Sequence, residues 1–539
     1  MRRSVPVWAA LLAAPLALAA LPAAAQTLRI GLAAETTTAD PHGYAVTPNA
    51  TLRFSVWQGL VDQAADLSIT PALATAWERE GDNVWRFTLR PGVKFHNGAD
   101  FTAQDVVASY CRIINNDGEV AQSYSRLVRP LANVEALDPM TVRITTKEPN
   151  PLLLNDLASL VIIPRSLVPA GTLNFAAGPQ CGVTGQWPAS TAFNDGSAAI
   201  GTGPFRLTTY TRSGTIELTR YDGYWGDKPH WQTVRMTPVT APGPRLAGLL
   251  ANDNDIIEAP GTADLARLRQ NTALQVTTSP TTRLIFLQLD TARSPSPFVQ
   301  GGSQPNPLRD ARVRQALSLA LDRRALYART MDEVTIPAAQ FLPDGMAGTL
   351  PGRPVLPYDP ARARALLAEA GFPDGFALTF HATNNRYIND GRLAQAIAQY
   401  WQRIGVRVEL DTMPSAVFFT RRARREFSVA MGGWSASAAE TMLFFQSWLV
   451  STDANRGQGT SNYGGWSSPE FDAVAQRAFT TMDPAARADL LREAGRIALD
   501  QMPVVPVHFE GASWAMRRMI RYAGRVDETT RAAEIRPAQ

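Results

Sequence analysis

Strand-like and helix-like segments alternate along this chain, and this alternation constrains its fold more than any other feature of the sequence. The segment TLRIGLA at 27–33 alternates apolar and polar residues, as a half-buried strand does. VWRFTLRPGVKF, from residue 84, predicts a strand, a Pro-Gly turn and a second strand. FRLTTYTRSGTIELTRY predicts a hairpin that turns at Ser213 and Gly214. Strands interleaved with helices are typical of an α/β protein.

The helical segments carry their own start and stop signals. Thr102 is a capping residue for the amphipathic helix in DFTAQDVVASYCRII. Asp359 followed by proline opens a helix that ends at Gly371, and Asp390 opens one that ends at Gly405, before the strand VRVEL. A further helix is predicted in LRDARVRQALSLALDRRAL. Two more are predicted to begin at the Ser-Pro pair at 468 and the Asp-Pro pair at 483. The segment PVVPVHF, near the end of the chain, predicts a strand. Because 539 residues exceed one compact domain, two or three lobes are expected.

The first 25 residues have the character of a secretory signal. Arg2 and Arg3 precede an apolar run that ends in small residues, which predicts cleavage after Ala25. A membrane anchor is the alternative, but Pro15 and Pro22 interrupt a run that is already short. No cysteine follows the run, so the sequence offers no site for a lipid anchor. We therefore expect a periplasmic protein that is released after export.

The net charge limits the classes of partner that the protein can bind, and the cysteine content indicates whether a disulfide forms. The formal charge of +4 falls to +2 without the two signal arginines, which argues against a nucleic-acid partner. The densest basic cluster, RRARRE at 421–426, fits a solvated helix face. Cys111 and Cys181 are the two cysteines, and an even count in an exported chain predicts a disulfide. Two buried free thiols are the alternative.

The sequence carries none of the common catalytic or metal-binding motifs. Its five histidines show no metal-ligand spacing, and neither cysteine lies in a CxxC pair. There is no GxSxG or GxxxxGK[ST] motif, and GTGPF at 201–205 precedes a strand rather than a helix. We predict no catalytic residues, no metal site and no cofactor, and hence no enzyme; an exported hydrolase would need a nucleophile and base that the sequence does not reveal.

A series of sequence blocks resembles one family of exported proteins. The longest, QGLVDQAADLSITPALATAWEREGDNVWRFTLRPGVKFHNGADFTAQDVVASY, is similar to the opening signature of the extracellular solute-binding protein family 5. Later blocks follow in that family's order: IGTGPFRLTTY, RYDGYWGDKP, LRDARVRQALSLALDRRAL, YDPARARALLAEAGF, WQRIGVRVEL and SSPEFD. The resemblance spans essentially the whole chain after the signal. The family includes dipeptide-, oligopeptide- and nickel-binding proteins of ATP-driven importers.

The resemblance implies a bilobal α/β periplasmic-binding-protein fold with an inserted subdomain and a hinged cleft between the lobes. It implies a monomer that captures a peptide-like or other small polar ligand by hinge closure and delivers it to an inner-membrane ABC permease with its ATPase subunits. A receptor for a metal chelate, an opine or a sugar-like solute, or an exported sensor or chaperone on the same fold, is the alternative. The implied parts are a signal peptide (1–25), domain Ia (26–56, 198–288 and 505–539), domain Ib (57–197) and domain II (289–504).

The segment GGWSASAAE at 432–440 is the strongest candidate for the ligand site. In peptide-binding relatives a Gly-Trp stretch lines the pocket, and an aspartate three residues after the tryptophan takes the ligand's amino group. Here Trp434 is present, but the matching position is Ser437, and the next acid is Glu440. A serine cannot neutralise a buried ammonium, so a ligand with a free amino terminus is in doubt. Trp434 as an ordinary core residue is the alternative.

Four further residues are candidates for ligand contact. Peptide-binding relatives use an arginine before the WQRIGV helix for the ligand carboxylate, and Arg386 suits that role; an exposed loop arginine is the alternative. His42 and Tyr44 follow the first strand, a favoured position for binding residues. Tyr463 precedes GGWSSPEFD and is expected to face the cleft or to serve a turn.

Overall fold

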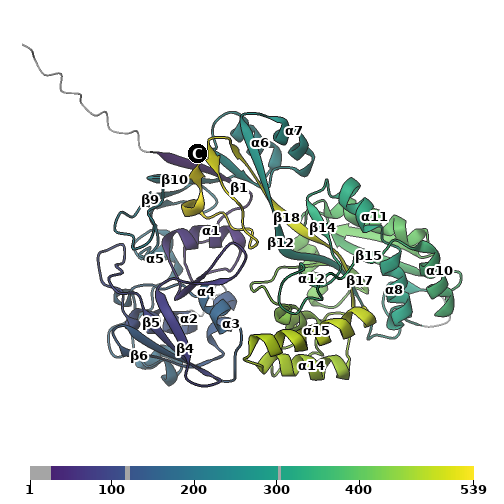
Figure 1. Ribbon diagram of the computed structural model, residues 1–539, viewed down its shortest axis with the longest axis horizontal. Coiled ribbons are helices and arrows are strands. Elements are labelled where there is room, and N and C mark those ends of the chain that lie inside the picture. The colour runs from purple at the N-terminus through teal and green to yellow at the C-terminus, as the bar shows by residue number, and fades with distance from the viewer. Residues whose placement is uncertain (1–25, 116–121, 302–304, 539) are drawn as a thin grey trace, which may run out of the picture.

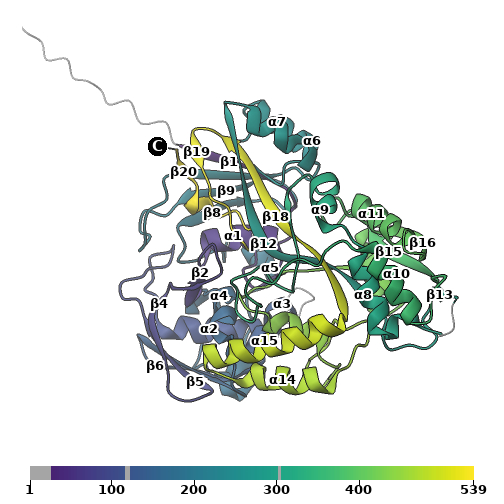
Figure 2. The same cartoon turned by 45° about the vertical axis from the view of Figure 1, so that its right-hand side comes forward.

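The computed structural model describes residues 26–115, 122–301 and 305–538, and the predicted signal segment 1–25 lies outside them. Two lobes lie side by side, joined by the long strands β12 (Leu274–Leu289) and β18 (Val504–Arg517) (Figure 1). These strands run antiparallel from lobe I into lobe II (Figure 2). They belong to one sheet of order β13-β15-β17-β12-β18-β11-β1-β10-β9-β8. Strands and helices are interspersed along the described chain, which confirms the expected α/β class.

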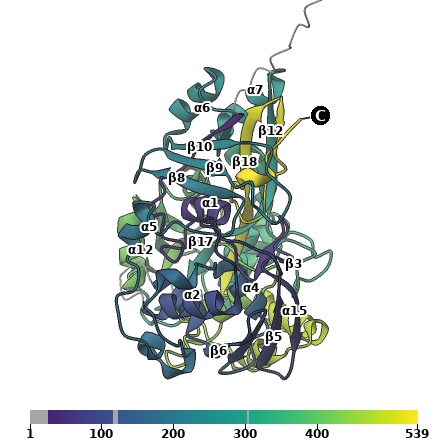
Figure 3. The same ribbon diagram turned by 90° about the vertical axis from the view of Figure 1, so that its left-hand side faces the viewer.

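The sheet of lobe I begins with the first strand of the mature chain. β1 (Thr27–Leu32) pairs in parallel with β10 (Thr233–Pro238) and β11 (Ile256–Glu258). The predicted hairpin forms as β8 (Phe205–Tyr210) and β9 (Ile216–Arg220), and β9 pairs with β10. Figure 3 shows these strands above α1 (Thr47–Val56). The apolar core under them includes Leu28, Ile30 and Trp514, so both ends of the chain build this lobe.

The inserted part of lobe I has a sheet and a core of its own. Its antiparallel strands follow the order β4 (Ala74–Arg79), β5 (Val84–Leu89), β7 (Thr141–Thr146) and β6 (Leu131–Asp138). Thr102 precedes α2 (Ala103–Asn115), and its backbone N–H and its hydroxyl donate to the Asp105 carboxylate at 2.7 and 3.0 Å. The strand predicted after the Pro-Gly turn does not form, because both edges of β5 are already paired; Lys94 makes a single bridge to Asp100.

A disulfide closes this inserted part. Cys111, on α2, is bonded to Cys181, in the short helix η4 (Pro179–Gly182), and their Cα atoms lie 6.0 Å apart. That separation is within the range of ordinary disulfides. Both sulfur-bearing residues are fully buried in the same apolar core. The pairing predicted from the cysteine count is therefore present, and no free cysteine occurs among the described residues.

Lobe II packs helices against the other end of the shared sheet. β15 (Ala377–Thr383) pairs in parallel with β16 (Arg407–Met413) and β17 (Val429–Trp434). The predicted helices form as α8 (Ala311–Leu319), α10 (Pro360–Glu369), α11 (Asp390–Gln402), α14 (Pro469–Thr480) and α15 (Pro484–Gln501). Asp359 accepts a hydrogen bond from the backbone N–H of Arg362, which confirms the predicted cap.

The remaining elements are short. The helices are α3 (Gln122–Val128), α4 (Leu153–Ser159), α5 (Ser190–Asn194), α6 (Pro242–Leu250), α7 (Leu265–Gln270), α9 (Arg323–Ala325), α12 (Ser415–Ala423) and α13 (Met442–Phe444). The strands are β2 (Val61–Gln63), β3 (Ile69–Pro71), β13 (Val299–Gln300), β14 (Thr335–Pro337), β19 (Ile520–Arg521) and β20 (Arg536–Pro537). Within the described ranges no helix combines the length and apolarity that crossing a membrane requires.

Candidate ligand-binding site

The Gly-Trp segment ends strand β17, where the neighbouring rings approach its backbone closely. Trp434 is opposite Leu284 of β12 in the sheet register. A Cβ atom added at Gly433 would lie 2.4 Å from the ring of Tyr387, and one added at Gly432 would lie 2.7 Å from the ring of Phe286. Both glycines are therefore needed for close packing rather than for a turn.

A row of aromatic rings extends from Trp434 across lobe II. The half-buried Trp434 ring lies 5.3 Å from the ring of Phe444. Phe444 stacks 6.3 Å from Trp448, and Trp448 meets Tyr463 edge-on at 6.1 Å. These separations are typical of favourable aromatic pairs. Two of the residues proposed from the sequence, Trp434 and Tyr463, thus belong to one aromatic wall, joined through Phe444 and Trp448.

Ser437 lies where the two lobes meet. Its side chain is exposed, and its backbone carbonyl accepts a hydrogen bond from Gln63 Nε2 of lobe I at 2.7 Å. Just before it, Thr282 Oγ1 exchanges hydrogen bonds with the backbone of Ala436. The segment after Trp434 is therefore anchored to strand β12 and also touches lobe I.

Glu440 is already paired inside lobe II. Its carboxylate accepts hydrogen bonds from Arg487 Nε at 3.0 and 3.1 Å, and both side chains are more than nine-tenths buried. With its charge balanced by Arg487, Glu440 needs no ammonium group from a ligand. A role as the ligand's counter-charge stays a prediction, and this ion pair competes with it.

Arg386 lies on an exposed loop between β15 and α11. Asp390 holds this loop, because its Oδ2 accepts hydrogen bonds from Thr383 Oγ1 and from the backbone N–H groups of Arg386 and Tyr387. The Arg386 guanidinium lies 5.3 Å from the ring centre of Tyr387, which in turn packs on Gly433. Arg386 is thus next to the Gly-Trp segment, and its contact with a ligand stays a prediction.

The two candidates from lobe I differ sharply in exposure. His42 is fully buried: its Nε2 lies 2.9 Å from the carbonyl of Val161, and its Nδ1 lies 3.0 Å from Arg112 Nη1. Arg112 also forms a buried ion pair with Asp40 at 2.7 Å. Burial, assisted by Arg112, lowers the pKa of His42 to about 3. These contacts give His42 a structural role, whereas Tyr44 is exposed on the surface of the loop.

The strands that join the lobes carry an ion cluster at a break in their pairing. The register of β12 and β18 is interrupted between Pro280 and Leu284, which leaves Arg283 beside Glu510 at 3.5 Å. Arg283 also binds Glu528 of lobe I through two hydrogen bonds of 2.9 and 2.8 Å. Glu510 accepts a 2.7 Å hydrogen bond from the backbone of Ile388 in lobe II. Burial raises the pKa of Glu510 to about 7.

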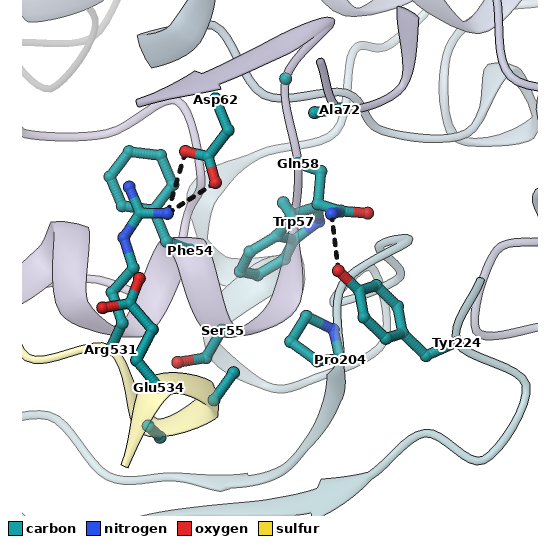
Figure 4. A pocket seen from close by; sticks show the side chains of 13 residues that line it. Phe54, Ser55, Trp57, Gln58, Asp62, Ala72, Pro204, Tyr224, Arg531 and Glu534 are labelled. Carbon is teal, nitrogen blue, oxygen red and sulfur yellow. Dashed lines mark hydrogen bonds and ion pairs between the residues drawn. The ribbon is translucent and has the colours of Figure 1, made fainter. Parts of the chain in front are cut away.

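A cavity of about 190 Å³ lies within lobe I, and its lining includes Phe54, Trp57, Gln58, Asp62, Tyr224 and Arg531 (Figure 4). Several of its polar side chains pair with one another. Arg531 donates to both carboxylate oxygens of Asp62 at 2.9 and 2.7 Å, and Gln58 donates to the Tyr224 hydroxyl at 3.1 Å. These side chains therefore have little capacity left for a ligand, and we place the candidate site at the aromatic wall.

Comparison with known proteins identifies the family. The profile of the bacterial extracellular solute-binding proteins, family 5, matches residues 68–456, which is more than half of the chain. This chain belongs to that family. Glutathione-binding protein GsiB of Salmonella paratyphi A is 28% identical over 521 residues, 93% of each chain. The dipeptide-binding protein of Escherichia coli K12 is 28% identical over 456 residues, 81% of this chain and 80% of that protein.

Solved structures of family 5 proteins confirm the bilobal fold. The structure of HbpA2 from Haemophilus parasuis covers 95% of this chain and 100% of its own, with a TM-score of 0.78 and 24% identity. The sequence relatives named above are binding proteins. Among the described residues there is no group of three or more His, Cys, Asp or Glu side chains that could hold a metal ion.

Arg422 belongs to the RRARRE cluster, which the sequence predicts to be one solvated face, but the structure separates it from its neighbours. Arg424 has an exposed side chain, and Arg421 is ion-paired with Glu426 at 2.8 Å. The Arg422 guanidinium, in contrast, packs among aromatic rings, and its Nε and Nη1 are buried. The spacing within the helix could have indicated this position. Arg422 comes four residues after Phe418 and three after Phe419, so all three side chains lie on the same face of α12.

Proposed function

We propose that this protein is the periplasmic binding component of an ABC importer. It captures a peptide-like or other small polar ligand between its lobes and delivers it to an inner-membrane permease with ATPase subunits. The observation that carries this proposal is the position of the Gly-Trp segment at the meeting of the lobes, where Gln63 of lobe I donates to the Ser437 carbonyl at 2.7 Å. Family membership and the names of the glutathione- and dipeptide-binding relatives support a ligand of this class.

The mechanism we propose is hinge closure by a monomer. The break between Pro280 and Leu284 interrupts the two joining strands, which supplies a point at which the lobes rotate. The proposed ligand contacts are Trp434, Ser437, Arg386 and Tyr463 from lobe II and Tyr44 from lobe I. His42 and Glu440, which have protein partners, are kept as lesser candidates. The domain boundaries inferred from the family are proposed unchanged, supported by the separate apolar cores of the inserted part and of lobe II.

The test is calorimetric titration with glutathione, dialanine and trialanine, followed by small-angle scattering at saturation. We expect one-to-one binding of at least one of these probes and a smaller radius of gyration in the complex. Trp434→Ala should weaken binding at least about tenfold, as for a buried aromatic anchor. The matched control Trp187→Ala, which changes a half-buried tryptophan of lobe I, should leave the affinity unchanged.

Two results would contradict the proposal. One is a radius of gyration that does not change at saturating ligand, which would exclude closure. The other is a Trp434→Ala protein that loses stability but keeps its affinity, which would make Trp434 a core residue. Binding of a metal chelate, an opine or a sugar in place of all three peptides would support the non-peptide alternative.

A further inference from the structure

We propose that Arg422 binds a carboxylate group of the ligand, so that the natural ligand is acidic. This inference rests on the proposed function, because it places the ligand against the aromatic wall of lobe II. Arg422 is in the last turn of α12, on the face of that helix that also carries Phe418 and Phe419.

Aromatic rings hold the guanidinium of Arg422 in place. Its central carbon lies 4.8 Å from the ring centre of Phe419, 5.2 Å from that of Tyr463 and 5.5 Å from that of Trp448. Contacts of this kind stabilise the planar cation through its faces while its N–H groups remain available at the edges. Arg422 is therefore positioned by the same two rings, Trp448 and Tyr463, that continue the aromatic row from Trp434.

Two nitrogen atoms of the Arg422 side chain, Nε and Nη1, donate no hydrogen bond within the described part of the protein, although the side chain also interacts with Tyr463 through a hydrogen bond. Both of these nitrogen atoms are buried. Buried donors of a charged group are costly to leave unpaired. Burial lowers the pKa of Arg422, and the nearby Tyr387 and Tyr463 oppose this effect. A ligand carboxylate would satisfy these donors and balance the charge.

Other buried or half-buried arginines near this site already have acidic partners. Arg487 pairs with Glu440 at 3.0 Å, and Arg283 pairs with Glu528 at 2.8 Å. The acid that lines the same small cavity as Arg422 is Asp290, whose carboxylate is bonded to Arg293 at 2.7 Å and to Ser296. Among the described residues, no carboxylate lies within ion-pair distance of Arg422.

The local charge of the wall favours the same class of ligand. Ser437 stands where peptide-binding relatives carry an acid, and Glu440 is neutralised by Arg487. Arg386 adds a second positive charge, and it lies close enough to Arg422 for the two guanidinium groups to repel. A wall with two arginines and, as far as the described residues show, no free acid attracts carboxylates and disfavours ammonium groups.

The experiment compares probes that differ in carboxylates but have nearly the same shape. N-acetyl-Ala-Glu is titrated against its diamide, and glutarate against glutaramide, by calorimetry with the full mature protein. We expect the wild type to bind the acids at least about tenfold tighter than the amides. Arg422→Gln should reduce this preference to about twofold or less. The control Arg424→Gln, which changes an exposed arginine two residues further along the chain, should keep it.

The outcomes of this experiment distinguish the proposed carboxylate site at Arg422 from the proposed binding of a peptide-like ligand. Equal binding of acids and amides by the wild type, or a preference that survives Arg422→Gln, overturns the assignment of Arg422. Binding of glutarate through Arg422 without binding of either peptide contradicts the peptide-like ligand but keeps the carboxylate site. Binding of no probe at all overturns both. If Arg422→Gln does not fold by circular dichroism, Arg422→Lys keeps the charge but loses the planar donor set, and a reduced preference is again expected.

Discussion

At the scale of single residues, the site depends on which charges the protein has already satisfied. Glu440 is balanced by Arg487, and His42 is enclosed by Val161 and Arg112. Arg422 keeps buried donors without partners. The exposed Ser437 has a side chain without charge next to the lobe contact. A substitution at this position therefore changes the charge of the wall without breaking an existing side-chain ion pair.

We predict that Ser437→Asp creates an ammonium-binding site. A carboxylate there would form a charge-assisted hydrogen bond with a free amino terminus, so affinity for free-amino peptides should rise by about 1–3 kcal/mol. Affinity for the matched N-acetylated peptides should not rise. Calorimetry on both peptide series, with Ser197→Asp in lobe I as the control, measures the difference. Wild-type protein that already binds free-amino peptides tightly would show that the pocket supplies another acid.

At the scale of elements, the inserted part of lobe I is held together by one covalent link. The disulfide ties α2 to a segment 70 residues later, across the core that also contains Phe95 and Tyr110. Helix α2 is a regular helix of 13 residues, whereas the segment around Cys181 has little regular structure, and Gln180 and Cys181 have positive φ. Without the link, that segment has few backbone hydrogen bonds to fix it on the core.

We predict that the double variant Cys111→Ala, Cys181→Ala is destabilised by about 4 kcal/mol. The loss reflects the entropy of the opened 70-residue loop in the unfolded chain. Urea unfolding followed by circular dichroism measures this change, and reductant should destabilise the wild type but not the variant. Non-reducing peptide mapping should recover the two cysteine peptides linked. Free thiols that react with an alkylating agent in periplasmic protein would contradict the pairing.

At the scale of the whole molecule, buried histidines make the folded state sensitive to acid. His42, His96 and His508 are buried, and burial lowers their pKa values to about 3, 4 and 3. The unfolded chain takes up these protons near pH 6.5, so it binds more protons than the folded state below that pH. Glu510, with its pKa raised to about 7 by burial, acts in the opposite direction between about pH 4.5 and 7.

We predict that stability falls as the pH is lowered from 7 to 5, because the three histidines outweigh the opposing carboxyl groups, of which Glu510 and Asp156, with pKa values raised by burial to about 7 and about 6, have the largest effect. Each buried histidine contributes a loss of about 2 kcal/mol at pH 5. His508→Leu should reduce the loss by that amount, since both of its ring nitrogens are buried without partners within the described residues. Urea unfolding at the two pH values tests this, and equal stability at both would contradict it.

The sequence by itself determined the local elements, the family resemblance and the cysteine pair. Caps such as Asp359 and hairpin turns such as Ser213 depend on neighbours within a few residues, so their signals are complete in the chain. The strand expected after residue 90 was wrong, because whether an edge is free for pairing depends on β4 and β7, which lie elsewhere in the sequence.

Only the tertiary structure decided which candidate side chains remain available for a ligand. Glu440 and Arg487 are 47 residues apart, and His42 and Arg112 are 70 apart, so no local pattern shows that they satisfy each other. In the sequence, Arg422 cannot be distinguished from the solvated arginines of RRARRE. In the folded protein, its guanidinium group packs against the rings of Trp448 and Tyr463. Pairing between distant charges is set by packing, because the cost of burying a charge depends on what surrounds it in space.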